Sequence, residues 1–168
     1  MNRTWARAGL LILALALSAG GWSWWSSPER RIRRILTAVA AAVNHDGPDT
    51  GLEALAAVAA LQQHLAPEVS IDPGTRAAPI AGRQEVIAFA ARLRAGSPML
   101  RVQFFDDEIA WRDEATATLL ATAQVTSRSR EGDEIVDVHD VEATVERREG
   151  NWVVTQARTL RDEPVTDR

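Results

Sequence analysis

The sequence lacks cysteine, tyrosine and lysine, all nineteen of its basic residues being arginine. Without cysteine, disulfides and thiolate metal sites are excluded, and the redox compartment cannot be inferred from cysteine usage. Phosphate-binding glycine loops, nucleophile elbows and cysteine–histidine pairs are also missing, so common nucleotide-binding and hydrolase signatures are absent. What is present is a chain of 168 residues, 46% hydrophobic, which fits one globular domain plus an appendage.

Negative charge predominates outside the amino-terminal part of the chain. Residues 1–44 carry six arginines against the single acid Glu29, a charge of +5, and the net charge of −4 leaves −9 for residues 45–168. Phosphate binding needs clustered cations. We therefore expect no nucleic-acid partner, and no motif indicates a cofactor.

The amino-terminal segment contains the longest uncharged run of the chain. Residues 8–27 have no charged side chain, two arginines precede them, and three tryptophans lie near the far end. A twenty-residue helix at about 1.5 Å per residue spans ~30 Å, the thickness of a bilayer core, and tryptophan favours its interface. Residues 1–27 are thus predicted to be a signal anchor that crosses a membrane through residues 8–25.

Two alternatives to an uncleaved anchor stay open. Ala14-Leu15-Ala16 or Ser18-Ala19-Gly20 would suit a signal peptidase, which predicts secretion, and a buried soluble helix is the third interpretation. The arginines at 30, 31, 33 and 34 favour a cytoplasmic domain by the positive-inside rule, but they also fit the wet face of a helix. We expect a single-pass protein of a bacterial-type inner membrane, with an extracytoplasmic domain.

Three amphipathic helices are predicted after this segment. Ser27-Pro28 begins one that runs to about Asn44, with apolar residues at helical spacing. Thr50-Gly51-Leu52-Glu53 is a capping box for a second helix, which ends before Pro67. The third covers residues 83–95 and is closed by Gly96 and Pro98.

Strand patterns dominate the rest of the chain. Residues 69–72 form a short strand candidate, and period-two segments cover residues 100–106, 115–129, 135–147 and 152–160, with an extension or bulge at 108–112. Three helices followed by an antiparallel meander predict an α+β fold, with the helices packed on one face of a curved sheet. We place one domain at residues 28–163 and a tail at 164–168.

The order of these elements resembles the nuclear transport factor 2-like superfamily, which has a cystatin-like cone fold. The similarity covers about residues 27–163 and rests on Ala66-Pro67-Glu68-Val69-Ser70-Ile71-Asp72-Pro73, on Gly82, and on Gly150-Asn151-Trp152-Val153-Val154. It implies three helices on a cone-shaped sheet. It does not fix a function, because such folds include enzymes and inert scaffolds.

Asp72 is the one catalytic residue that the resemblance carries over, since it matches the general base of ketosteroid isomerase in its Asp-Pro context. A carboxylate at the mouth of an apolar cone moves a proton beside a carbonyl, provided an acid stabilises the oxyanion. The isomerase's tyrosine has no match in a chain without tyrosine, and Val141 lies about where its protonated aspartate would be. Asp72 before Pro73-Gly74 also fits a turn held by its own side chain.

His139 is the second candidate, because strand alternation places His139 and Asp137 on the cone-facing side of residues 135–145. A neutral histidine beside a carboxylate serves as acid or base near pH 7, so His139 is the predicted partner of Asp72. The alternative is that both lie at a wet strand end. Alternation sends Asp140 and Glu142 to the opposite face, so no metal site is expected.

The remaining candidates are ligand-pocket residues. Phe104, Trp111, Val141 and Arg158 are predicted to line a pocket, although core packing or a solvated face explains each of them as well. His45, in a loop, and His64, near a helix end where a cation suits the dipole, are interpreted as structural or surface residues.

The sequence therefore favours a membrane-tethered cone domain that binds a small apolar ligand or a protein partner without established catalysis. The first alternative is an isomerase, dehydratase or cyclase that uses Asp72 as base with His139. The second is an assembly subunit of an envelope complex, which pairs as a homodimer through the open sheet face.

Overall fold

A computed structural model describes residues 27–47, 50–74, 78–129 and 131–160. The predicted anchor, residues 8–25, lies outside these ranges. Within them, no helix combines the length and the apolar character that a membrane crossing needs.

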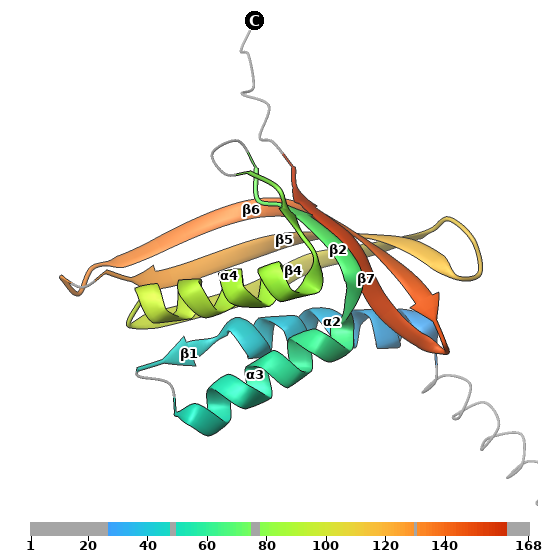
Figure 1. The fold of residues 1–168 in the computed structure, drawn as a ribbon. Helices are drawn as coiled ribbons and strands as arrows, with labels where there is room; N and C mark the ends of the chain where they lie inside the picture. The colour runs from blue at the N-terminus through green and yellow to red at the C-terminus, as the bar shows by residue number, and fades with distance from the viewer. Residues whose placement is uncertain (1–26, 48–49, 75–77, 130, 161–168) are drawn as a thin grey trace, which may run out of the picture.

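Three helices lie on one side of a curved sheet, as expected (Figure 1). They are α2, Pro28–Val43; α3, Gly51–His64; and α4, Arg83–Gly96. The capping box of α3 is confirmed, because the Thr50 hydroxyl accepts from the Glu53 N–H and the Glu53 carboxylate accepts from the Thr50 N–H. Gly82 precedes α4 at φ 92°, a backbone conformation that glycine adopts without a Cβ penalty.

The sheet has seven strands in the order β1-β4-β5-β6-β7-β2-β3. The four long strands are β4, Met99–Trp111; β5, Thr116–Arg128; β6, Glu134–Arg148; and β7, Asn151–Thr159. They form the predicted antiparallel meander. The flanking strands are β1, His45–Asp46; β2, Leu65–Asp72; and β3, Ile80–Ala81.

Two details of the sheet differ from the sequence expectation. Strand β2 begins at Leu65 rather than Val69, and it pairs with β7 in parallel, so the sheet is mixed. This pairing places β2 next to β7 in the sheet. Helix α3 ends at His64, directly before β2 begins at Leu65. The expected irregularity near Glu108 is confirmed, since the β4–β5 register shifts between Phe105 and Glu108.

The strand registers divide the sheet into two faces. Ile71, Ala157, Ala143 and Leu119 lie side by side across four strands and pack against the buried cluster, so their side is called the core face. The neighbouring row on the other side is called the outer face, and it contains Asp72, Arg158, Glu142, Leu120 and Glu108.

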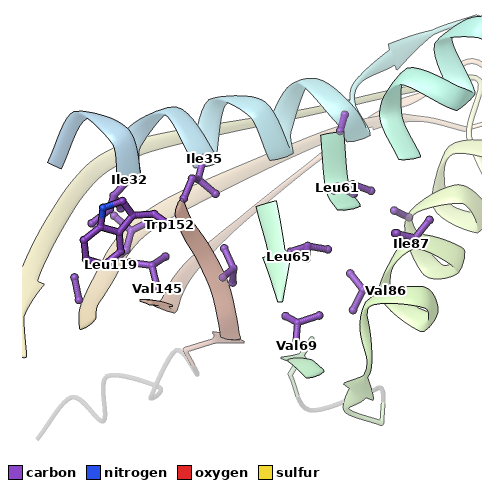
Figure 2. Close-up of a cluster of buried hydrophobic side chains, with 14 residues drawn as sticks. Ile32, Ile35, Leu61, Leu65, Val69, Val86, Ile87, Leu119, Val145 and Trp152 are labelled. Atoms are coloured by element: carbon purple, nitrogen blue, oxygen red, sulfur yellow. The ribbon is translucent and has the colours of Figure 1, made fainter. Parts of the chain in front are cut away.

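The core lies between the helices and the core face of the sheet (Figure 2). Ile32 and Ile35 of α2 approach Trp152, Val145 and Leu119, while Leu61 and Ile87 lie near Leu65 at the other end of the cluster. Ile32, Val69 and Val145 have no exposed surface. Each such side chain contributes roughly 1.5–3 kcal/mol by leaving water.

Candidate ligand-binding site

Asp72 is exposed at the end of β2, and its carboxylate serves the following turn. The Asp72 Oδ1 accepts a hydrogen bond of 3.0 Å from the Gly74 N–H, and Gly74 has φ 96°. A short carboxylate that binds the backbone two residues on is a common way to fix a turn. This hydrogen bond matches the alternative role of Asp72, in which its side chain holds a turn. The β2–β7 register places Asp72 on the outer face.

His139 and Asp137 lie on the core face of β6, opposite Ala123 and Val125, and both are exposed. The structure thus separates Asp72 from His139 by placing them on opposite faces of the sheet. It keeps His139 and Asp137 together as neighbours in one strand. In the described part of the chain, no three histidine or acidic side chains are grouped closely enough to hold a metal ion.

The four predicted pocket residues do not share one site. Phe104 is half-buried and lines a hollow of about 470 Å³ against α2, while Val141 is half-buried on β6. Trp111 is exposed, with its ring 5.6 Å from that of Trp152. Arg158 lies on the outer face and forms a 3.0 Å ion pair with Glu142.

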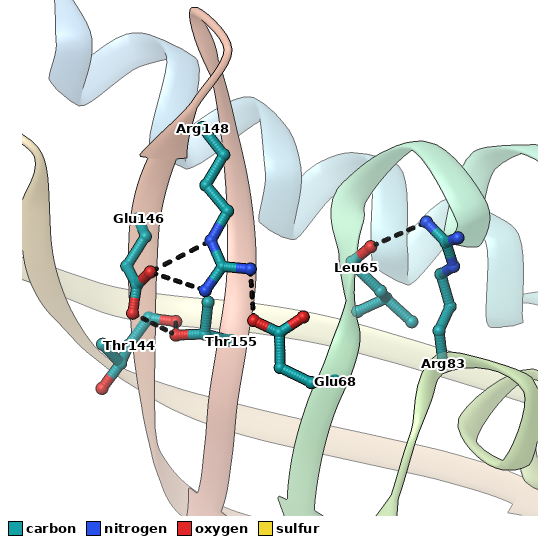
Figure 3. A network of polar contacts seen from close by, with 7 residues as sticks. All are labelled: Leu65, Glu68, Arg83, Thr144, Glu146, Arg148 and Thr155. Atoms are coloured by element: carbon teal, nitrogen blue, oxygen red, sulfur yellow. Dashed lines mark hydrogen bonds and ion pairs between the residues drawn. The ribbon is translucent and has the colours of Figure 1, made fainter.

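The outer face around β2, β7 and β6 is occupied by a polar network (Figure 3). The Arg148 guanidinium binds Glu68 of β2 and also Glu146, at 2.8 Å, and Thr155 donates to Glu146. The pKa of the Glu68 carboxyl is lowered, first by a hydrogen bond from the Glu68 backbone and then by the hydrogen bond from Arg148. Glu68 and Arg148 are exposed, Glu146 and Thr155 are partly buried, and the four groups satisfy one another. Exposed ion pairs of this kind contribute little to stability.

A cavity of about 620 Å³ lies between α3 and α4 and is called the α3–α4 cavity. Six of its fifteen lining residues are alanines, and Val58, Leu61 and Ile87 add larger apolar surface. Ligand pockets commonly measure about 300–1,000 Å³ and have apolar walls with a few polar groups. The α3–α4 cavity has this size and character.

Arg94 and His45 are the two basic residues in the wall of the α3–α4 cavity. Arg94 is 8% exposed, and its guanidinium donates to the Ala42 carbonyl at 2.7 Å and to the Asn44 carbonyl at 2.9 Å. A cation that binds the last carbonyls of a helix also complements its dipole. Arg94 therefore fixes the end of α2 against α4.

His45 continues this wall on β1. Its Nε2 lies 2.8 Å from the Ser97 carbonyl, which accepts only, so Nε2 carries the proton in the neutral ring. The other ring nitrogen, Nδ1, is buried and has no hydrogen-bond partner among the described residues. Buried polar atoms are nearly always bonded. Because Nδ1 has almost no accessible surface, a donor group on a bound molecule reaches its lone pair only after the ring turns toward the cavity.

The composition of α3 explains the cavity. A second cavity of about 510 Å³ lies between α2 and α3, so α3 has open space on both flanks. Ala57 lines both cavities, and Leu61 is the one buried residue of α3. Methyl side chains are too short to fill the distance to the neighbouring helices.

Sequence reasoning missed this site. Arg94 was not singled out, and His45 was interpreted as a loop or surface residue. The available signal was the alanine-rich run at 54–60, in which five of seven residues are alanine. His64, interpreted as a structural or surface residue near the helix end, is partly buried, and burial lowers the pKa of its imidazole.

Comparisons with known proteins show the fold. No protein-family model and no curated protein matches the chain. Among solved structures, Aln2 from a Streptomyces species is similar at 18% identity and TM-score 0.62, over 81% of this chain and 93% of that one. A candidate dehydratase of the NTF2-like family from Streptomyces avermitilis is 16% identical, with TM-score 0.59, over 79% and 96%.

A third similar structure is an uncharacterised protein with a cystatin-like fold from Caulobacter vibrioides. It is 12% identical, with TM-score 0.61, over 80% of this chain and 90% of that one. The predicted nuclear transport factor 2-like, cystatin-like fold is confirmed by these similarities. At identities this low, the similar structures give no evidence for an activity of this chain.

Proposed function

We propose that this domain binds a small apolar molecule in the α3–α4 cavity without catalysing its conversion. The observation that carries the proposal is the 620 Å³ alanine-lined cavity between α3 and α4, whose wall includes His45, a residue with one ring nitrogen that has no partner among the described residues. The ligand class that fits is an apolar body with one hydroxyl or N–H donor. Burial of the body supplies the affinity, and the donor to His45 fixes the orientation.

The wall of the α3–α4 cavity supports binding more than chemistry. Arg94 is bound to two backbone carbonyls, and none of the described residues that line the cavity carries a carboxylate. General acid–base catalysis needs a second proton-transfer group within reach of the reacting atoms. A single histidine acceptor in an apolar wall suits recognition of a donor.

Thermal unfolding of the chain lacking residues 1–27 tests the proposal, with 1-octanol and its methyl ether as probes. The ether has a similar apolar chain and no donor. We expect 1-octanol to raise the Tm by several degrees near 100 times its Kd, where ligand linkage gives about 2.7 kcal/mol. The ether should stabilise less. Equal shifts would contradict the role of His45, and no shift with either probe would contradict the cavity as a binding site.

Membrane attachment is the second part of the proposal, and residues 8–25 support it through their length and lack of charge. Tethering would place the α3–α4 cavity close to a source of apolar molecules. Alkaline carbonate extraction of membranes that contain the full chain tests the attachment. Release of the whole chain into the soluble fraction would contradict it.

An isomerase, dehydratase or cyclase activity through Asp72 and His139 is the alternative function. It is supported by a likeness of fold to a candidate dehydratase. It is opposed by the turn hydrogen bond of Asp72 and by the placement of His139 on the other face of the sheet. For any activity that is found, an Asp72→Asn variant with an unchanged rate would eliminate this base.

A further inference from the structure

The amino-terminal half of β6 has one unpaired edge. Strand β7 pairs with β6 from Val141 onward, and the Leu160 N–H donates to the Asp140 carbonyl at 2.7 Å. Residues 134–139 therefore extend beyond β7, and among the described residues no strand pairs with them on the side away from β5. Unpaired backbone groups in a row form a template for another strand.

The side chains along this edge are exposed and partly apolar. Residues 134–140 are all exposed, and Ile135, Val136 and Val138 show 49%, 49% and 53% of their surface. Edge strands are commonly blunted by a proline, a bulge, a cover or charged side chains. Residues 134–140 contain no proline, their β5–β6 register is regular, and no other described strand covers them. Their acids, Glu134, Asp137 and Asp140, are the feature of this kind that they have.

The direction of the backbone groups follows from the bond at Asp140. Its carbonyl points toward β7, and in an antiparallel strand this direction alternates from one residue to the next. The N–H and C=O groups of Glu134, Val136 and Val138 therefore point out of the free edge. The side-chain hydrogen bond of 2.8 Å between Thr122 and Asp140 agrees, because it fits a non-hydrogen-bonded pair on the β5 side.

We propose that a second copy of this chain pairs with this edge, β6 to β6, about a two-fold axis at Val136. In that register Val136 lies opposite Val136 of the second copy, and Val138 lies opposite its Glu134. Glu134, Val136 and Val138 of one copy thus find all their partners in the same three residues of the second copy. Two seven-stranded sheets become one continuous sheet with both helix layers on the same side.

Avoidance of like charges favours this register over the one with its axis at Asp137. With the axis at Val136, Asp133 lies opposite His139 of the second copy and Ile135 lies opposite its Asp137. An axis at Asp137 would bring the two Asp137 carboxylates directly opposite each other, which is destabilising. It would also leave the outward N–H of Glu134 without an acceptor on the second copy, because the Asp140 carbonyl is already bound to the Leu160 N–H.

The chain's own residues 161–168 fit the edge less well. Continuing the register from Leu160 would place Glu163 opposite Asp137, an acid against an acid. Pro164 would fall opposite Val136, where the register requires an N–H donor. A second copy meets neither obstacle. Its Gly132 falls opposite Asp140, where Leu160 is bound, but the Gly132 N–H is already turned back to the Ser129 carbonyl at 3.1 Å.

Disulfide trapping of the full-length chain tests the proposal directly, because the chain has no cysteine of its own. Val136→Cys should give a cross-linked dimer on oxidation, since a hydrogen-bonded pair has Cα atoms about 5.5 Å apart, within disulfide range. Val138→Cys is the matched control, because its two copies would lie roughly 14 Å apart. Glu134→Cys mixed with Val138→Cys should cross-link.

The outcomes separate the edge from other contacts. We expect about tenfold more dimer for Val136→Cys than for Val138→Cys, as the disulfide distance limit requires. Equal dimer from both variants, or no dimer from Val136→Cys, would overturn the proposal. Stronger cross-linking by Gln103→Cys, on the outer face of β4, would show pairing through the sheet face instead and would also overturn it.

Discussion

Helices α2 and α3 lie on the same side of the sheet, but α2 is tightly packed and α3 is loosely packed. Helix α2 inserts Ile32 and Ile35, which are 0% and 3% exposed, into the core beside Trp152. Helix α3 buries Leu61 alone, exposes Leu52 and Leu55 at 81% and 69%, and has a cavity on each flank. Large side chains hold the fold together, and small ones create the space that we propose a ligand fills.

The largest expected effect is at the tightly packed helix. Ile32→Ala should lower the free energy of unfolding by about 2–5 kcal/mol, because it removes a fully buried side chain and leaves a void. Leu55→Ala on α3 should change it by less than about 0.5 kcal/mol. Urea unfolding of both variants checks the contrast. Similar losses would mean that α3 packs as tightly as α2.

The next effect tests the contact through which Arg94 of α4 holds the end of α2. Arg94→Met should cost about 1–3 kcal/mol, because the Ala42 and Asn44 carbonyls lose a buried donor. Arg92→Met, two residues earlier and exposed, is the matched control. If thermal unfolding shows the two variants to be equally stable, the guanidinium of Arg94 does not fix the end of α2.

A smaller effect of opposite sign is expected on α3. Ala57→Leu should raise stability by about 0.5–2 kcal/mol in the absence of ligand, because the added side chain enters one of the two cavities. Ala59→Leu lies on the exposed side of the same helix and should be nearly neutral. Destabilisation by Ala57→Leu alone would show that α3 has no room on its flanks.

The smallest effect concerns pH at the end of α3. Burial lowers the pKa of His64, so the unfolded chain binds more protons than the folded one in the window below the ordinary value of about 6.5. Stability should fall as the pH drops through this window and then level off below the folded pKa. His64→Gln should remove this slope. An unchanged pH profile of unfolding in His64→Gln would contradict the assignment.

Most of the fold was predictable because its signals are local. The Thr50 and Glu53 capping box, the helical stripe of α2 and the alternation of the four long strands each depend on residues close in sequence. The parallel pairing of β2 with β7 was not predicted, since it joins segments that lie far apart in the sequence. No local pattern specifies such a partner.

The candidate site was less predictable than the fold. Asp72 has the sequence context of a catalytic base, yet its carboxylate binds the Gly74 N–H, and only the three-dimensional register reveals that His139 lies on the other face. The α3–α4 cavity exists because its alanine side chains are too short to fill the space between the helices. An alanine-rich helix predicts close packing as readily as open space until its neighbours are placed.

The most direct test of the proposed cavity is the ligand-induced Tm shift in two matched variants of α3. Val58→Phe enlarges a residue that lines the α3–α4 cavity, whereas Leu55→Phe enlarges an exposed residue one turn earlier. With both variants folded, the proposal predicts that 1-octanol no longer raises the Tm of Val58→Phe and still raises that of Leu55→Phe. An equal rise in both variants would contradict it.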